Sequence, residues 1–207
     1  PLSPEAVLAT GRAIGRWLRE TFADPVVVIG RDTRPSGEQI THALLAGLAA
    51  EGAAADDVGV ITTPGIAHLT RALGYSLGIV ISASHNPAAY NGIKLCRAGA
   101  KPVGQDTGLA TIRDELVAGV PGHDGPPGAA TDRDVLPEYG EFLRSLVDVS
   151  ALRPMRVAVD AGNGMAGLTA PAVLGKIPGL TLLPLYFELD GSFPNHEANP
   201  LDPANLV

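Results

Sequence analysis

Apolar residues recur along the first part of the chain in two alternating patterns, one typical of surface helices and one typical of buried strands. Over residues 2–20 they return every three or four positions, which predicts an amphipathic helix that Ser3 caps and Pro4 begins. Short β-branched runs and further helical patterns then follow in turn. The predicted strands are residues 26–30, 57–61 and 77–82, and the predicted helices between them are residues 36–50 and 63–74. Ser36 and Gln39 are expected to form a capping box at the start of the first of these two helices.

The same alternation restarts in the last third of the chain. Residues 105–119 and 136–147 predict helices, and the Gly- and Pro-rich stretch 120–132 between them predicts a loop. Strand, Gly-rich turn, helix and strand are then predicted in order over 155–187. This order is typical of an α/β fold with a mixed, mostly parallel sheet covered by helices on both faces. We expect a first domain at 1–148 and, at 149–207, the beginning of a second similar α/β domain, which is too short for the sheet it begins.

Composition narrows the class of protein. The chain has 207 residues, of which 45% are hydrophobic and 18% are charged, as expected for a globular domain with a sizeable core. The net charge of −7 is spread along the chain without a run of Lys or Arg, so neither a nucleic acid nor a membrane is expected as a partner. Cys96 is the only cysteine, which excludes an intrachain disulfide and favours a cytoplasmic location. The sequence does not indicate an oligomeric state.

Two polar loops follow predicted strands, where ligands gather in open α/β sheets. The first is GRDTRPSG at 30–37, in which Arg31 and Arg34 have the fixed charge and fork geometry that suit phosphate oxygens. The alternative for this loop is a surface turn with an Asp–Arg pair. The second is SASHNP at 82–87, in which Ser84 is either a turn hydroxyl or a nucleophile.

Ser84 and His85 are sequence neighbours, and neighbours form the usual nucleophile–base hydrogen bond only with an unusual backbone. Their surroundings nevertheless favour chemistry, because Asn86 and Lys94 lie within ten residues of Ser84 and the chain has only three lysines. A phosphoryl group on Ser84 would need such donors, cations and a general acid/base.

The stretch SASHNPAAYNGIKL at 82–95 resembles the active-serine loop of the α-D-phosphohexomutases, the family of phosphoglucomutase and phosphomannomutase. Three further segments resemble family motifs in the same order. They are GRDTRPSG at 30–37, VAVDAGNGMAG at 157–167 and DGSFPNHEANPLDPANL at 190–206. The last segment is most similar to the phosphomannomutase/phosphoglucomutase branch and less similar to phosphoglucosamine mutases.

The resemblance implies that phosphorylated Ser84 passes its phosphoryl group to a hexose 1- or 6-phosphate of mannose or glucose, giving a bound hexose 1,6-bisphosphate that reorients and returns the other phosphate. It further implies Lys94 as general acid/base and His85 and Asn86 as residues that orient the phosphoserine. Arg31 and Arg34 would support the phosphoryl group electrostatically. Mg²⁺ is the implied cofactor, with Ser84 as a ligand through its phosphate.

Several family segments have no counterpart in this sequence, among them an Arg-Gly motif before Pro1 and a metal loop after Val207. One phosphoserine oxygen is too few for a hard cation. We therefore expect an N-terminal fragment whose activity belongs to the full-length protein. Two alternatives stay open: a phosphoserine-based phosphatase that releases inorganic phosphate, and a sugar-phosphate-binding or degenerate non-catalytic domain.

A few polar residues outside these loops are weaker candidates. Asp160 and Asn163 either touch a ligand or form the turn before a helix. His196 and Glu197 are possible metal ligands, although their Pro-rich surroundings favour an ordered loop. The other three histidines away from the serine loop, at 42, 68 and 123, are interpreted as surface or packing residues.

Overall fold

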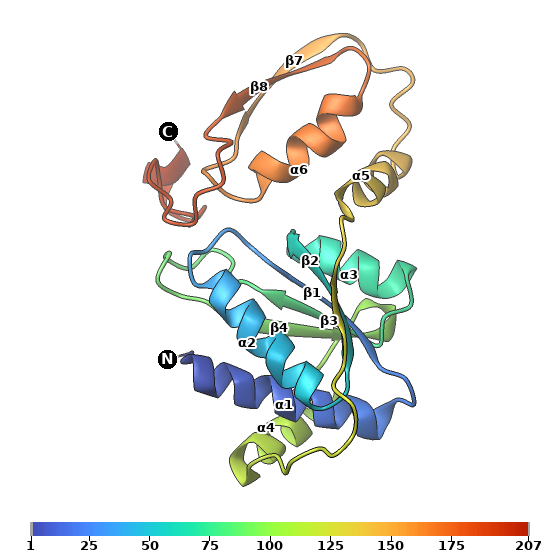
Figure 1. The fold of residues 1–207 in the computed structure, drawn as a ribbon. Helices are drawn as coiled ribbons and strands as arrows, with labels where there is room; N and C mark the ends of the chain where they lie inside the picture. The colour runs from blue at the N-terminus through green and yellow to red at the C-terminus, as the bar shows by residue number, and fades with distance from the viewer. Residues whose placement is uncertain (1, 207) are drawn as a thin grey trace.

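The computed structural model describes residues 2–206 and begins with an α/β domain built on a six-stranded sheet (Figure 1). The strand order is β5-β4-β3-β1-β2-β6. The strands are β1 (Val26–Arg31), β2 (Ala54–Val60), β3 (Leu77–Ile81), β4 (Ile93–Arg97), β5 (Lys101–Pro102) and β6 (Ala130–Asp132). The helices are α1 (Pro4–Thr21), α2 (Gly37–Ala50), α3 (Thr63–Ala72) and α4 (Leu109–Ala118), with 3₁₀ turns at Ala98–Ala100 and Gln105–Thr107.

Helices cover both faces of the sheet, as the sequence predicts. On one face α1, α2 and α4 pack on alternate residues of β1 and β3, forming a core that includes Ile14, Leu44, Ile29 and Ile79. On the other face α3 packs on the intervening residues in a second core around Val28. The predicted α/β class, with a mixed and mostly parallel sheet, is confirmed.

The direction of the strands gathers the polar loops at one edge. β1 is parallel to both β2 and β3, whereas β4 runs antiparallel to β3 with Ile81 opposite Ile93. Because the parallel strands all end at the same edge, the segments that follow them, 32–36, 61–62 and 82–92, lie close together. The sheet thereby brings the two candidate loops of the sequence to one place.

The second unit begins a similar arrangement. Strands β7 (Met155–Asp160) and β8 (Leu180–Leu185) are parallel, and α6 (Ala166–Val173) with a 3₁₀ turn at Leu174–Lys176 connects them. Helix α5 (Leu136–Ser145) lies between the two units, packing on α6 and stacking Phe142 on His68 of α3 with ring centroids 3.7 Å apart (Figure 1). A last 3₁₀ turn spans Pro203–Leu206. The predicted boundary between the two domains, between residues 148 and 149, stays a prediction.

Two local predictions were wrong. The stretch 120–132 was expected to be a loop throughout, but its end forms β6, which pairs with β2 through residues such as Thr131. The capping box at Ser36 is absent, since Ser36 has helical dihedrals and its side chain makes no bond to the helix start. Its hydroxyl instead accepts a hydrogen bond from Asn91 at 3.0 Å, a tertiary partner that local sequence does not reveal.

No helix between residues 2 and 206 combines the length and the apolar character that a membrane crossing requires.

Candidate active site

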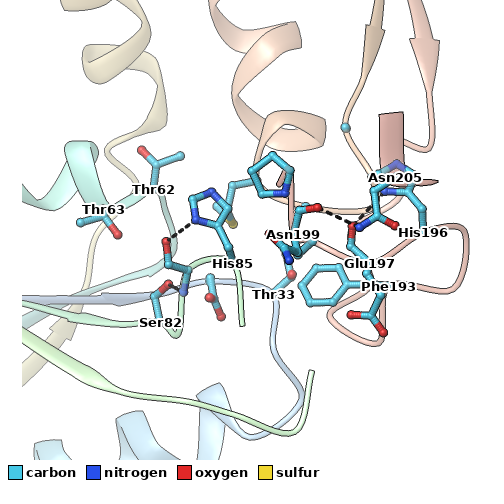
Figure 2. Close-up of a pocket in the computed structure, with 18 of the residues that line it drawn as sticks. Thr33, Thr62, Thr63, Ser82, His85, Phe193, His196, Glu197, Asn199 and Asn205 are labelled. Atoms are coloured by element: carbon cyan, nitrogen blue, oxygen red, sulfur yellow. Dashed lines mark hydrogen bonds between the residues drawn. The ribbon is translucent and has the colours of Figure 1, made fainter. Parts of the chain in front are cut away.

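A cavity of about 630 Å³ opens at the carboxyl edge of the first sheet, and residues of the second unit line its far side (Figure 2). From the first unit it is lined by Asp32, Thr33, Ile61, Thr62, Thr63, Pro64, Ser82, Ser84 and His85. From the second unit it is lined by Asp160–Gly162, Gly164, Met165, Phe193, His196–Pro200 and Asn205. Figure 2 shows His85 between Thr62 and Thr63 on one side and the segment of Phe193 and Glu197 on the other.

Ser84 has the unusual backbone that the sequence argument required. Its φ is 56°, in the left-handed region that non-glycine residues seldom adopt, and its Oγ lies 3.3 Å from Nδ1 of His85. Its N–H donates to Oγ of the buried Ser82 at 3.0 Å. Strained backbone of this kind costs on the order of 1–3 kcal/mol and is concentrated at functional sites. The loop thus presents the Ser84 hydroxyl and His85 together at the cavity.

Asn86 closes the turn of this loop. Its Nδ2 donates to the carbonyl of Ala83 at 2.7 Å, and its backbone N–H donates to the same oxygen at 3.1 Å. The residue also lines a second, adjoining cavity of about 500 Å³ together with Ser84. Asn86 is therefore next to the serine, while its side-chain donor is used within the loop.

Arg34 lies beneath the serine loop with its side chain fully buried. Its Nε donates to the Asp32 carboxylate at 3.1 Å, and its Nη1 and Nη2 each donate to two backbone carbonyls. The four acceptors are the carbonyls of Ser84 at 2.8 Å, Asn86 at 2.7 Å, Pro87 at 2.6 Å and Tyr90 at 3.0 Å. Each of the five N–H groups of the guanidinium therefore has an acceptor within the protein, and four of these acceptors hold the loop.

The other two basic residues singled out in the sequence, like Arg34, are not among the residues that line the cavity. Arg31 ends β1 with Nη1 3.8 Å from Oδ1 of Asp57 and packs near Gly37 at the start of α2. Lys94 is exposed on β4, opposite Val80, and so is on the sheet face that α3 covers. Within residues 2–206, those that line the cavity include neither Arg31 nor Lys94.

The second unit contributes a histidine–carboxylate pair to the cavity. Nε2 of His196 lies 3.2 Å from Oδ1 of Asp160, and its Nδ1 lies 3.1 Å from the carbonyl oxygen of Glu197. The backbone acceptor at Glu197 and then the Asp160 carboxylate raise the pKa of His196 above its ordinary value, because both favour the doubly protonated ring. Asp160 also accepts from the N–H of Gly162 at 2.8 Å, so it serves both the turn and the cavity.

Thr62 and Thr63, at the start of α3, line the cavity although they were not among the site residues predicted from the sequence. Oγ1 of Thr62 accepts from the N–H of Gly65 at 3.2 Å and caps this helix, and Pro64 occupies its first turn. The Thr-Thr-Pro sequence directly after a predicted strand is the signal that identifies such a helix start. A helix N-terminus favours anions, so this wall suits a phosphate group.

A metal site is incomplete in this part of the protein. Within residues 2–206, no three or more His, Cys, Asp or Glu side chains are grouped so that they could hold a metal ion. Mg²⁺ requires several oxygen ligands in near-octahedral geometry, and the described residues do not supply such a set around Ser84.

Comparison with known proteins matches both units. Residues 1–118 match the model for phosphoglucomutase/phosphomannomutase α/β/α domain I, and residues 137–207 match the model for domain II. A phosphomannomutase/phosphoglucomutase of Pseudomonas aeruginosa is 36% identical over 99% of this chain, and a phosphoglucosamine mutase of Koribacter versatilis is 39% identical over 86% of it. The crystal structure of a phosphoglucomutase/phosphomannomutase family protein from Burkholderia thailandensis superposes with a TM-score of 0.83 at 34% identity and covers 99% of this chain.

The chain spans less than half the length of these proteins, covering 42% of the Pseudomonas protein, 40% of the Koribacter protein and 45% of the Burkholderia chain. Two domain models matched in order, together with a serine loop at the carboxyl edge of the first sheet, place the sequence without ambiguity. The chain belongs to the phosphoglucomutase/phosphomannomutase family.

Proposed function

We propose that the full-length protein carrying this chain is a phosphohexomutase that interconverts hexose 1-phosphate and hexose 6-phosphate through a phosphoserine at Ser84. The observation that carries this proposal is the backbone of Ser84, whose φ of 56° presents the hydroxyl to a cavity shared by the two units. Strained backbone of this kind is concentrated at functional sites, which supports a chemical role for this serine.

In the proposed reaction a sugar hydroxyl oxygen attacks the phosphorus of phosphoserine 84. A bond from that oxygen to phosphorus forms, the bond from phosphorus to Oγ of Ser84 breaks with its electron pair left on Oγ, and a hexose 1,6-bisphosphate results. The serine oxygen takes up a proton, so that Ser84 is left as a free hydroxyl. The proton of the sugar hydroxyl passes to a general base. The family resemblance names Lys94 for this role, and in this structure Lys94 is exposed on β4, outside the residues that line the cavity. After the bisphosphate reorients in the cavity, the opposite phosphate returns to Ser84 by the reverse step, so that no phosphate is released.

Neighbouring groups support this chemistry in different ways. His85 orients the serine oxygen through its 3.3 Å contact, and Asn86 holds the turn. The start of α3 at Thr62 and Thr63 offers the positive end of a helix dipole to a phosphate in the cavity. Arg34, whose N–H groups are engaged with the loop, supports the phosphoryl group by charge alone, and Arg31 does so from farther away.

Mg²⁺ is proposed as the cofactor from the family resemblance, with phosphoserine 84 as one ligand and the rest contributed from outside this sequence. Mannose and glucose phosphates are the proposed substrates, because the family models name those two mutases. The single cysteine favours a cytoplasmic enzyme.

The test is an intact mass of the full-length protein from its native host, followed by peptide mapping and an isomerisation assay. A single phosphoryl group on Ser84, with conversion of mannose or glucose 1-phosphate to the 6-phosphate, is the expected result. Release of inorganic phosphate without isomerisation would indicate a phosphatase. An unmodified Ser84 in an inactive protein would indicate a binding domain.

A further inference from the structure

A short segment of the second unit, residues 190–193, docks directly on the residue that supports the serine loop. The ring of Phe193 lies against the Arg34 guanidinium, with 5.4 Å from Cζ to the ring centroid. Gly191 packs so closely on the backbone of Thr33 and Arg34 that a Cβ at this position would overlap the Thr33 carbonyl oxygen and the Cα of Arg34. The contact therefore depends on glycine at 191.

The docking segment is fixed within its own unit by Asn163, which is buried and has a left-handed backbone. Nδ2 of Asn163 donates to the carbonyl of Glu188 at 3.0 Å, and its Oδ1 accepts from Nδ2 of Asn195 at 2.6 Å. The N–H of Asp190 donates to the Asn163 carbonyl at 3.0 Å. Bonds on both sides of residues 190–193 thus make the segment a firm projection of the second unit.

Arg34 connects this projection to the nucleophile. One face of its guanidinium is covered by Phe193, while its edge donates to the carbonyls of Ser84, Asn86, Pro87 and Tyr90. An arginine over an aromatic ring gains on the order of 0.5–2 kcal/mol, and covering the guanidinium keeps water from competing for its hydrogen bonds. Movement of Phe193 would therefore loosen the bonds that keep Ser84 in its left-handed conformation.

We propose that residues 190–193 act as a positioning element, through which the second domain holds Arg34 and thereby the conformation of the loop carrying Ser84. The nucleophile is competent only while the two units are docked. The effect of this element on phosphoryl transfer rests on the proposed function, whereas its effect on loop order does not.

The experiment uses Gly191→Ala, which places a methyl group between segment 190–193 and Arg34 without touching the serine loop. Gly175→Ala in the same unit is the matched control, because its Cβ would meet only Leu182 Cδ1, at 4.0 Å. Phe193→Leu is the second variant, which removes the aromatic face and keeps an apolar side chain. Amide hydrogen exchange of residues 84–92 is measured in the full-length, unphosphorylated protein, and kcat and KM are measured for sugar-phosphate isomerisation.

We expect exchange in residues 84–92 to rise roughly tenfold in Gly191→Ala and by about threefold in Phe193→Leu, with the control within twofold of wild type. We expect kcat of Gly191→Ala to fall by a similar factor while its KM stays within about twofold, since Gly191 lies outside the cavity lining and loop geometry is what is disturbed. Phe193 lines the cavity, so Phe193→Leu is judged by loop exchange alone. Should Gly191→Ala fail to fold, amide exchange of residues 84–92 in Phe193→Leu tests the proposal.

Unchanged loop exchange in a folded Gly191→Ala or Phe193→Leu protein would overturn the proposal, as would looser exchange with an unaltered kcat in Gly191→Ala. A wild-type protein with no phosphate on Ser84 and no isomerase activity would instead remove the proposed function. The exchange comparison would still decide whether residues 190–193 hold the loop, so the two failures are distinguishable.

Discussion

Nη2 of Arg34 donates a hydrogen bond of 2.8 Å to the carbonyl oxygen of Ser84, from a guanidinium that is wholly buried. The residue that the sequence presents as a phosphate binder is thus bonded to the backbone of Ser84, the proposed nucleophile. Its charge is balanced by Asp32 at 3.1 Å, and its remaining donors span the loop from residue 84 to residue 90. Because the guanidinium is planar and rigid, a buried arginine with this many acceptors fixes the positions of the carbonyls it binds.

Replacing Arg34 by Lys should separate charge from geometry. A lysine keeps the positive charge but has three donors in place of five, so at least two acceptors lose their partner at a cost of about 1–3 kcal/mol each. We expect a loss of about 2–5 kcal/mol in the free energy of unfolding in urea and a fall in kcat of more than tenfold.

Arg144→Lys is the control for this change, because Arg144 donates to one carbonyl, that of Ala172, at the contact of α5 and α6. The free energy of unfolding of Arg144→Lys should fall by no more than about 1 kcal/mol. Equal effects of the two substitutions on stability and on kcat would show that Arg34 has no special relation to the serine loop.

Ser82→Ala should weaken the loop from its other side. The buried hydroxyl of Ser82 accepts the N–H of Ser84 at 3.0 Å, and its removal leaves that donor without its partner. We expect the free energy of unfolding, measured by urea denaturation, to fall by about 1–2 kcal/mol. Ser145→Ala, which removes an exposed hydroxyl bonded to the Phe142 carbonyl, should stay within about 0.5 kcal/mol of wild type. A Ser82 variant as stable as this control would contradict the role assigned to the hydroxyl.

His196 should titrate above the ordinary histidine value of 6.5, because the Glu197 carbonyl and the Asp160 carboxylate both favour its protonated ring. A raised pKa in the folded state means that the contribution to stability is complete below about pH 6.5 and is lost as the pH rises through the folded-state value. Asp160→Asn should lower the pKa of His196, as measured from its ring protons by NMR.

His68 provides the internal comparison in the same spectra. Burial is the main cause that lowers its pKa below 6.5, so it should titrate on the acid side of His196. If His196 titrated at or below His68, the described pairing with Asp160 would be incorrect in solution.

Tyr75 should make stability fall at high pH. Burial first, and then its hydrogen bond to Asp56, raises the pKa of Tyr75 to about 12, compared with 10.0 for an exposed tyrosine. Because the unfolded chain loses this proton first, the contribution of Tyr75 is complete below pH 10 and declines as the pH approaches about 12. Tyr75→Phe should remove that decline, as measured by urea unfolding at a series of pH values. A parallel decline in the variant would assign the effect to other groups.

The sequence by itself determined the α/β class, most of the order of helices and strands, and the position of Ser84 in a polar loop after a strand. These depend on local patterns: the apolar runs at 26–30 and 77–82 predict strands with buried residues, and the polar stretches after them are expected at the ends of those strands. The resemblance of residues 82–95 to a family loop depends likewise on contiguous residues.

Only the tertiary structure decided which residues hold the loop of Ser84. Arg34 and Ser84 are fifty positions apart, and Phe193 is more distant still, yet parallel strands and a docked second unit bring them together. The hydroxyl of Ser36 accepts a hydrogen bond from Asn91 instead of capping a helix, and residues 130–132 form a strand because they pair with β2. Both partners are distant in sequence. Hydrogen bonds and close packing between residues distant in sequence depend on the tertiary fold, and local residue patterns do not specify which distant residues will be in contact.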